Sequence, residues 1–314
     1  MRAPIISPSR RVGPRSIAVS ATHDIADNIR GMSLMILCMA TFTTNDSLMK
    51  AVTRTLPLYE SIAIRGACVL GLMLIFARVQ GRRIQVAVPR GDVGTLILRG
   101  AADIVSTALY LLALRQMALA DISAIMQALP LAVTLAAAVI FRERLGWRRL
   151  SAIGIGFLGV LLILRPGTGA FDGWSVAALS AMGLIVVRDI STRLFSPAIS
   201  SSTIAFHAAL MVMLSGFVLG FGEDWRVPNL FELGLLGMAA SLLTVGYLTA
   251  VASMRVGEVS FVAPFRYTSL LWAIFLGLVI FGEWPDLWTW AGSMLVVGAG
   301  IYSILRERQL RRSS

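Results

Sequence analysis

Residues 110–123 decide the fold, because a similar stretch returns 137 positions later. The first copy reads YLLALRQMALADIS, and the second, at 247–260, reads YLTAVASMRVGEVS. Tyr110 corresponds to Tyr247, and methionine, an acidic residue and serine recur at matching places. A repeat of this spacing in a chain of 314 residues predicts two halves of similar structure.

Both copies lead into a long apolar run that contains a proline and ends on the pattern Phe-x-Glu. The first run contains Pro130 and ends at Phe141-x-Glu143, and the second contains Pro264 and ends at Phe281-x-Glu283. The second run is three residues longer than the first. The likeness between the halves therefore extends beyond a single motif.

The composition is that of a membrane protein. Apolar residues make up 57% of the chain and charged residues 14%, and the mean hydropathy is +0.78. A soluble domain carries about 25% charged residues, and a helix that crosses a bilayer needs about 20 apolar residues. We therefore expect the lipid bilayer as a partner. The net charge of +11 is interpreted as membrane-topology charge rather than as a nucleic-acid surface.

The apolar runs predict an all-α integral membrane protein with ten spans. We expect a basic cytoplasmic tail over 1–30, one five-helix repeat over 31–165, a second over 172–306 and a basic tail over 307–314. The expected spans are 31–53, 58–79, 92–114, 120–141, 147–165, 173–195, 200–221, 231–252, 258–281 and 286–306.

Basic residues predict the orientation of these spans, because they gather on the cytoplasmic side of membrane proteins. With the N-terminus placed inside, the inner segments hold 19 basic residues and the outer segments hold five. Both tails are therefore expected in the cytoplasm. The preference for arginine over lysine, with Lys50 the only lysine, favours a bacterial inner membrane.

Five spans in each half is an odd number, so the two halves must cross the membrane in opposite directions. Inverted repeats of this kind are typical of secondary transporters, which expose one site to each side of the membrane in turn. The sequence has no nucleotide-binding loop. We therefore expect transport of a small polar solute without ATP, with a proton as a candidate coupling ion.

The paired five-helix halves, the Phe-x-Glu endings and the run APFRYTSLLW at 263–272 resemble the drug/metabolite transporter superfamily, EamA type. The resemblance covers about 30–306. It implies a ten-helix bundle with a central cavity and the uptake or export of a small metabolite. Similar members, matched around Asn45, Asp46 and 263–283, include transporters of riboflavin and of S-adenosylmethionine. Amino-acid-like metabolites are further candidate solutes.

Two acid–base pairs at a spacing of four recur in the halves and are candidates for coupling or gating. Asp46 and Lys50 in the first half correspond to Asp189 and Arg193 in the second. A spacing of four places both charges on one helix face, so each pair is expected to neutralise itself. Anchoring of the helix ends is the alternative role. Arg188 is expected to point elsewhere and to need another partner or water.

Other charges in the spans are candidates for solute binding, because such groups usually face a cavity or a partner. Arg99 and Asp103 are four apart in one half only, so they are expected to serve the solute or a structural pair. Arg266 is expected to bind an anionic group of the solute or to pair with Asp103 across the bundle. Arg65 should point inward, and its counterpart His207 either couples protons or is simply hydrogen-bonded.

Prolines and aromatic residues complete the candidate site. Pro130 and Pro264 are expected to break their helices and free carbonyl groups beside the site. The aromatic side chains are expected to enclose the apolar part of a solute or to pack in the core. They are Tyr110, Tyr247, Phe265, Tyr267 and Trp272.

The competing interpretations are a membrane-embedded enzyme and a multi-pass protein that transports nothing. The chain has only two histidines and lacks a metal-ligand spacing or a nucleophile motif, so we expect no enzyme, cofactor or metal. Glycines on the fifth and tenth spans favour close helix packing within the bundle or a homodimer. They lie at positions 154, 156, 159, 292, 298 and 300.

Overall fold

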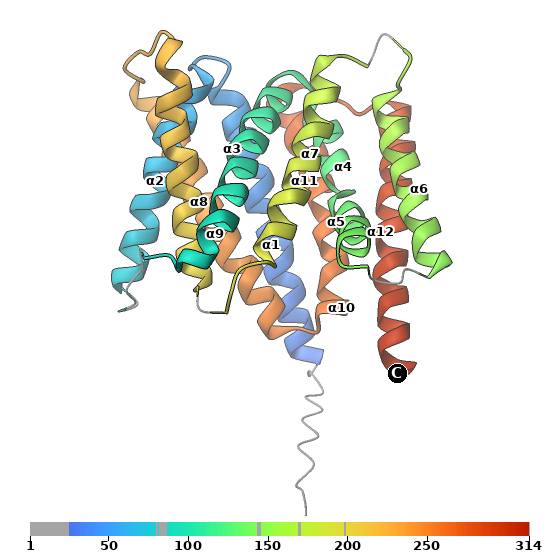
Figure 1. Cartoon of the computed structure of the whole chain (residues 1–314). Coiled ribbons are helices and arrows are strands. Elements are labelled where there is room, and N and C mark those ends of the chain that lie inside the picture. The colour runs from blue at the N-terminus through green and yellow to red at the C-terminus, as the bar shows by residue number, and fades with distance from the viewer. Residues whose placement is uncertain are drawn as a thin grey trace, which may run out of the picture.

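The structure, a computed structural model, describes residues 25–79, 81, 87–142, 146–168, 171–197 and 199–313. Figure 1 shows a bundle of helices, and no strand occurs in the ranges described. Ten stretches are long and apolar enough to cross a membrane, which confirms the expected all-α class. Glu143, which ends the first Phe-x-Glu pattern, lies outside these ranges.

The spans follow the expected boundaries closely. Two differences lie near the chain ends. Helix α1 begins at Ile25 and α12 continues to Ser313, so both helices extend into segments that the sequence predicts as tails. The single-helix spans are α1 (Ile25–Val52), α2 (Leu58–Val79), α3 (Val93–Gln116, after the short helix η1, Arg90–Asp92), α6 (Trp147–Leu164), α7 (Gly173–Thr192), α8 (Ser201–Leu219, followed by η2, Gly220–Gly222), α9 (Leu230–Val256) and α12 (Leu287–Ser313).

The remaining two spans are broken at the expected prolines. The fourth consists of α4 (Leu119–Met126) and α5 (Leu129–Ile140), with Pro130 in the first turn of α5. The ninth consists of α10 (Val259–Val262), η3 (Ala263–Tyr267), α11 (Thr268–Leu276) and η4 (Gly277–Phe281). Proline is tolerated in a first turn, where its missing N–H has no helical partner to lose. The wider π-turn of η4 was not predicted.

The packing of the helices repeats the relation between the halves. By sequence, α1 corresponds to α7 and α3 to α9, and in the structure α1 packs along α9 while α3 packs along α7. Each half therefore supplies one helix to each of these two seams. Helices α2 and α8 correspond and pack on each other, as do α6 and α12. These contacts are those expected if a two-fold rotation exchanges the halves.

The two halves also share a backbone conformation at the Phe-x-Glu endings. Arg142 has φ 54° and its counterpart Gly282 has φ 67°, so both chains turn through the left-handed region after the phenylalanine. Glycine adopts this region without steric cost, whereas arginine does so rarely. The start of α1 and the end of α12 lie at one end of the bundle in Figure 1. The assignment of this end to the cytoplasm stays a prediction.

Helices α6 and α12 approach each other through two glycines. A Cβ at Gly159 would lie 2.6 Å from the carbonyl oxygen of Gly292, and a Cβ at Gly292 would lie 2.5 Å from that of Gly159. Gly154 and Gly298 have nothing within 4 Å of such an atom. Gly159 and Gly292 therefore serve packing within the bundle. The homodimer stays a prediction.

This geometry predicts opposite outcomes for two alanine substitutions on α12. Gly292→Ala should destabilise the protein by about 1–3 kcal/mol, because the methyl group must push the two backbones apart. Gly298→Ala adds the same methyl group in open space and should be neutral or stabilising. Thermal unfolding in detergent compares the two variants. Equal unfolding temperatures would contradict the assigned close contact.

Candidate functional site

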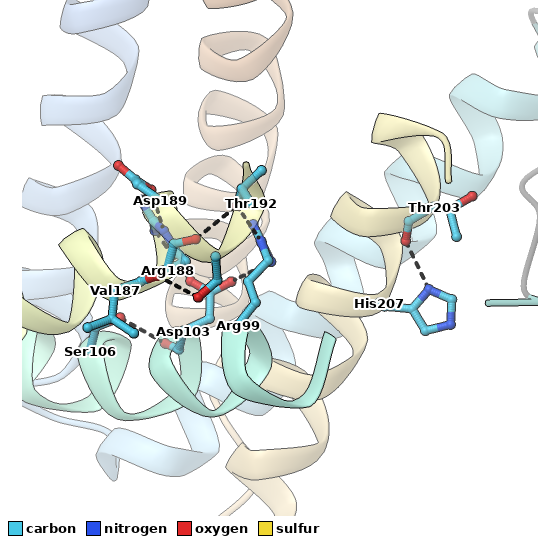
Figure 2. A network of polar contacts seen from close by, with 10 residues as sticks. Arg99, Asp103, Ser106, Val187, Arg188, Asp189, Thr192, Thr203 and His207 are labelled. Carbon is cyan, nitrogen blue, oxygen red and sulfur yellow. Dashed lines mark hydrogen bonds and ion pairs between the residues drawn. The ribbon is translucent and has the colours of Figure 1, made fainter. Parts of the chain in front are cut away.

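Four charged side chains meet between α3 and α7 (Figure 2). Asp103 on α3 lies 3.4 Å from Arg99 Nη1 on the same helix and 3.3 Å from Arg188 Nη1 on α7. Arg188 also contacts Asp189, at 2.9 Å between Nη2 and Oδ1, and Arg99 Nε donates to Thr192 Oγ1 at 3.0 Å. The expected pair of Arg99 with Asp103 is confirmed. Its link to α7 was not predicted.

The expected pair of Asp189 with Arg193 is wrong. Asp189 bonds to its neighbour Arg188, while the side chain of Arg193, beyond the end of α7, is exposed and has no hydrogen bond or ion pair to any described residue. The side chain of Arg188 is long enough for its guanidinium to contact both the adjacent carboxylate of Asp189 and that of Asp103. The prediction from helix-face spacing failed here because it does not account for the length of the arginine side chain.

A second polar group lies where α1, α2 and α3 meet. The hydroxyl of Tyr110 donates to Asp46 Oδ2 at 2.8 Å, and Asn45 Nδ2 donates to Asp46 Oδ1 at 3.0 Å. Arg65 Nη1 donates to Asn45 Oδ1 at 3.5 Å, so Arg65 points into the protein as expected. No described cation lies within ion-pair distance of Asp46.

Tyr247 on α9 stands between the two groups. It lies within electrostatic reach of Arg65, Arg99, Arg188 and Asp103, although no direct hydrogen bond joins them. Its repeat counterpart Tyr110 also lies near Arg65, so the two related tyrosines converge on one region from α3 and α9.

Tyr247 is 58% exposed, and its ring contacts Phe42 edge-on at 5.3 Å. We call the combined set the polar cluster. It consists of Asn45, Asp46, Arg65, Arg99, Asp103, Tyr110, Arg188, Asp189, Thr192 and Tyr247.

A separate ionic contact lies at the end of the bundle opposite the start of α1 and the end of α12. Lys50 at the end of α1 is 1% exposed, and its ammonium lies 2.6 Å from Glu283 Oε1 and 2.6 Å from the carbonyl of Met117. Glu283 Oε2 accepts the N–H of Leu119 at 2.9 Å. The ammonium also lies 4.9 Å from the ring centre of Phe281. We call this set the Lys50 lock.

The lock corrects the expected pair of Asp46 with Lys50. Both residues have other partners, because Lys50 extends along α1 toward Glu283 while Asp46 turns toward α3. Burial of Lys50 also excludes the alternative of a lysine that reaches the membrane surface. The Phe-x-Glu repeat marked Glu283 in the sequence, but its partner could not be found there because the two residues are 233 positions apart.

His207 and Arg266 lie outside the polar cluster. His207 Nδ1 is 2.9 Å from the carbonyl oxygen of Thr203 on its own helix, and Figure 2 shows it apart from the network of Arg99 and Asp103. Arg266 is exposed on η3. Its expected alternative partner Asp103 is occupied by the arginines of α3 and α7.

The aromatic residues after Pro264 face other parts of the protein. The hydroxyl of buried Tyr267 occupies the space beside Gly300 on α12, where a Cβ would lie 1.5 Å from it. The rings of Phe265 and Phe261 contact each other at 6.0 Å, and those of Trp272 and Phe275 at 6.2 Å. None of the three predicted residues, Phe265, Tyr267 and Trp272, has a hydrogen bond or ring contact with the polar cluster.

The two proline breaks meet across the bundle. Gln127, between α4 and α5, donates through Nε2 to the carbonyl of Arg266 at 3.2 Å and to Ser269 Oγ at 2.5 Å. The carbonyl of Arg266, two residues after Pro264, is thus bonded by a residue from the break at Pro130. The predicted cavity-lining role of the prolines stays a prediction. Over the described residues, no three potential ligands among His, Cys, Asp and Glu lie close enough to hold a metal ion.

The fold and the polar cluster define a multi-pass membrane protein in which two inverted halves hold charged groups between their spans. Among membrane proteins this construction is characteristic of secondary transporters. The model of the EamA-like transporter family matches residues 29–165 and again 173–306, so the chain belongs to this family. The resemblance drawn from the sequence is confirmed.

Known relatives agree with this membership. The S-adenosylmethionine uptake transporter of Rickettsia prowazekii is 25% identical over 182 residues, which is 58% of this chain and 62% of that protein, less than two thirds of its length. The pseudopaline exporter CntI of Pseudomonas aeruginosa is 27% identical over 273 residues, covering 86% of this chain and 94% of that protein. A solved crystal structure shares the fold, with a TM-score of 0.64 at 17% identity over 90% of this chain and 98% of that chain.

Proposed function

We propose that this protein carries a small polar metabolite across the membrane by alternating access, without ATP, and that the polar cluster binds the solute. The observation that carries the proposal is the meeting of ionised groups from both halves within membrane-spanning helices. Asp46, Arg65 and Asp103 come from the first half, and Arg188 and Asp189 come from the second.

The energetic cost of these groups supports a functional role. One ionised side chain at the centre of a span costs about 2.5–3.5 kcal/mol on insertion scales, and such residues usually mark a solute or ion pathway. Static packing of α3 on α7 does not need them, because the equivalent seam of α9 on α1 carries Leu236 and Ala240 in place of Arg99 and Asp103. Arg99 and Asp103 are thus charges that only the first half carries at these equivalent positions.

The Lys50 lock supports the second part of the proposal. It joins α1, the turn between α3 and α4, and the end of η4, which are segments of both halves. At the opposite end, the counterpart Arg193 is exposed and makes no such contact with described residues. We propose that the lock breaks when the protein opens toward its side.

We also propose that the proton is the coupling ion and that Asp46 is its site. Asp103 and Asp189 are each within ion-pair distance of an arginine. Among the described residues, the carboxylate of Asp46 has only the hydrogen bonds of Tyr110 and Asn45.

Transport is tested with purified protein in sealed vesicles that are loaded on one side with a labelled solute. S-adenosylmethionine and riboflavin are the first probes, because relatives or similar family members carry them. We expect protein-dependent counterflow of a probe, with no ATP present, and its loss in Arg188→Leu. Conversion of a probe to a new product in detergent, without counterflow in vesicles, would favour the membrane-embedded enzyme instead.

A further inference from the structure

Arg65 is the only arginine of the polar cluster without an ion pair to a described residue. A guanidinium has five N–H donors, and Arg65 uses one of them in the 3.5 Å bond to Asn45 Oδ1. That distance is beyond the usual range of an N–H···O bond. Most of the donors of this half-buried side chain therefore have no acceptor among the described residues.

Asp46 has unused capacity to accept hydrogen bonds, just as Arg65 has unused donors. Its two oxygens each accept one hydrogen bond, from Tyr110 and from Asn45, and each keeps capacity to accept another. Asn45 is 2% exposed and contacts both charged groups, because its amide donates to Asp46 and its carbonyl accepts from Arg65. Asn45 and Tyr110 thus hold the carboxylate near the guanidinium but outside ion-pair distance.

The other acidic members of the polar cluster do not fill this gap. Asp103 is engaged by two arginines, and Asp189 is engaged by Arg188. Arg65 therefore offers open donors and Asp46 offers open acceptors a short distance apart. A carboxylate that approached Arg65 would also approach the negative charge of Asp46, so a positive charge on the same molecule is needed for balance.

We propose that the solute is a zwitterion, with a carboxylate bound by Arg65 and an ammonium group bound by Asp46. This inference rests on the proposed transport function and names the solute class of the same site. Guanidinium and carboxylate match in shape and form paired charge-assisted hydrogen bonds. Tyr247, with its exposed ring nearby, supplies an aromatic surface for the remainder of the solute.

The test uses the intact protein in detergent and its thermal stabilisation by defined probes, since a ligand of the folded state raises its stability. The probes are the twenty protein amino acids, S-adenosylmethionine and riboflavin, which lacks both charged groups. For the zwitterion that stabilises most, the carboxamide and the N-acetyl derivative remove one charge each. We expect each derivative to bind about 10-fold to 100-fold more weakly than its parent.

Two variants assign the charges to the two residues. Arg65→Ala should weaken binding of the zwitterion about 10-fold to 100-fold and abolish the preference for the parent over its carboxamide. Asp46→Asn should abolish the preference for the parent over its N-acetyl derivative, because the solute's positive charge is no longer needed. His207→Ala is the matched control, since it changes the repeat counterpart of Arg65 outside the cluster, and both preferences should remain.

The outcomes separate this inference from the transport function. Stabilisation by none of the zwitterions, or preferences that survive both variants, would overturn the zwitterion site. Stabilisation and counterflow with riboflavin alone would also overturn it and would leave transport standing. Absence of protein-dependent counterflow for every probe would overturn the transport function itself.

Discussion

Asp103→Ala should be among the most damaging single substitutions in the membrane-spanning part of the protein. It removes the carboxylate that lies 3.4 Å from Arg99 and 3.3 Å from Arg188, and so leaves Arg99 without an ion pair. Breaking a buried ion pair by removing one partner costs about 3–5 kcal/mol. Because the Asp103 side chain is 13% exposed, the lower end of this range is expected. Thermal unfolding in detergent measures the loss.

A double variant separates this stability effect from function. Arg99→Leu with Asp103→Ala carries the residues that the second half has at the equivalent places, Leu236 and Ala240. It removes both charges together and keeps the contact of Arg188 with Asp189, so most of the stability should return. Counterflow should remain absent, because the polar cluster is incomplete. A double variant that is as unstable as Asp103→Ala would contradict the pairwise account.

Glu283→Ala should open the end of the bundle that the Lys50 lock closes. It leaves a lysine that is 1% exposed with only the carbonyl of Met117, and it deprives the N–H of Leu119 of its acceptor. We expect a loss of about 3–5 kcal/mol from the closed state, and hence a shift toward conformations open on this side. The shift is measured as faster labelling of a cysteine at position 110 by an impermeant maleimide added on the lock side.

Arg54→Ala is the matched control for the lock. Arg54 lies 3.9 Å from Glu283 and near the ring of Phe281, but its side chain is 51% exposed. An exposed ion pair contributes about 0–1 kcal/mol, so the labelling rate should change little. Equal acceleration by Arg54→Ala and Glu283→Ala would show that the buried lysine does not hold this end closed.

The sequence predicted the elements of this fold because the features that determine them are local. Span length and proline position are readable without contacts, and the internal repeat required opposite directions for the two halves. The breaks at Pro130 and Pro264 were found for the same reason. The early start of α1 at Ile25 was missed because polar residues there resemble a tail.

The partners of the charged residues could be predicted only in part. Arg99 and Asp103 were paired correctly because both lie on one helix. The partners of Lys50 and Arg188 were missed, since they come from η4 and α3 and depend on how distant helices pack. Tyr267 was assigned to the site from its place in the chain, whereas its ring turns toward Gly300.

The most direct test of alternating access needs no knowledge of the solute. A single cysteine replaces Tyr247 in a protein whose two native cysteines, Cys38 and Cys68, are changed to alanine. An impermeant maleimide is then added to either side of oriented vesicles. We expect labelling from both sides, with labelling from the lock side increased by Glu283→Ala. Labelling from one side only, unchanged by Glu283→Ala, would contradict alternating access.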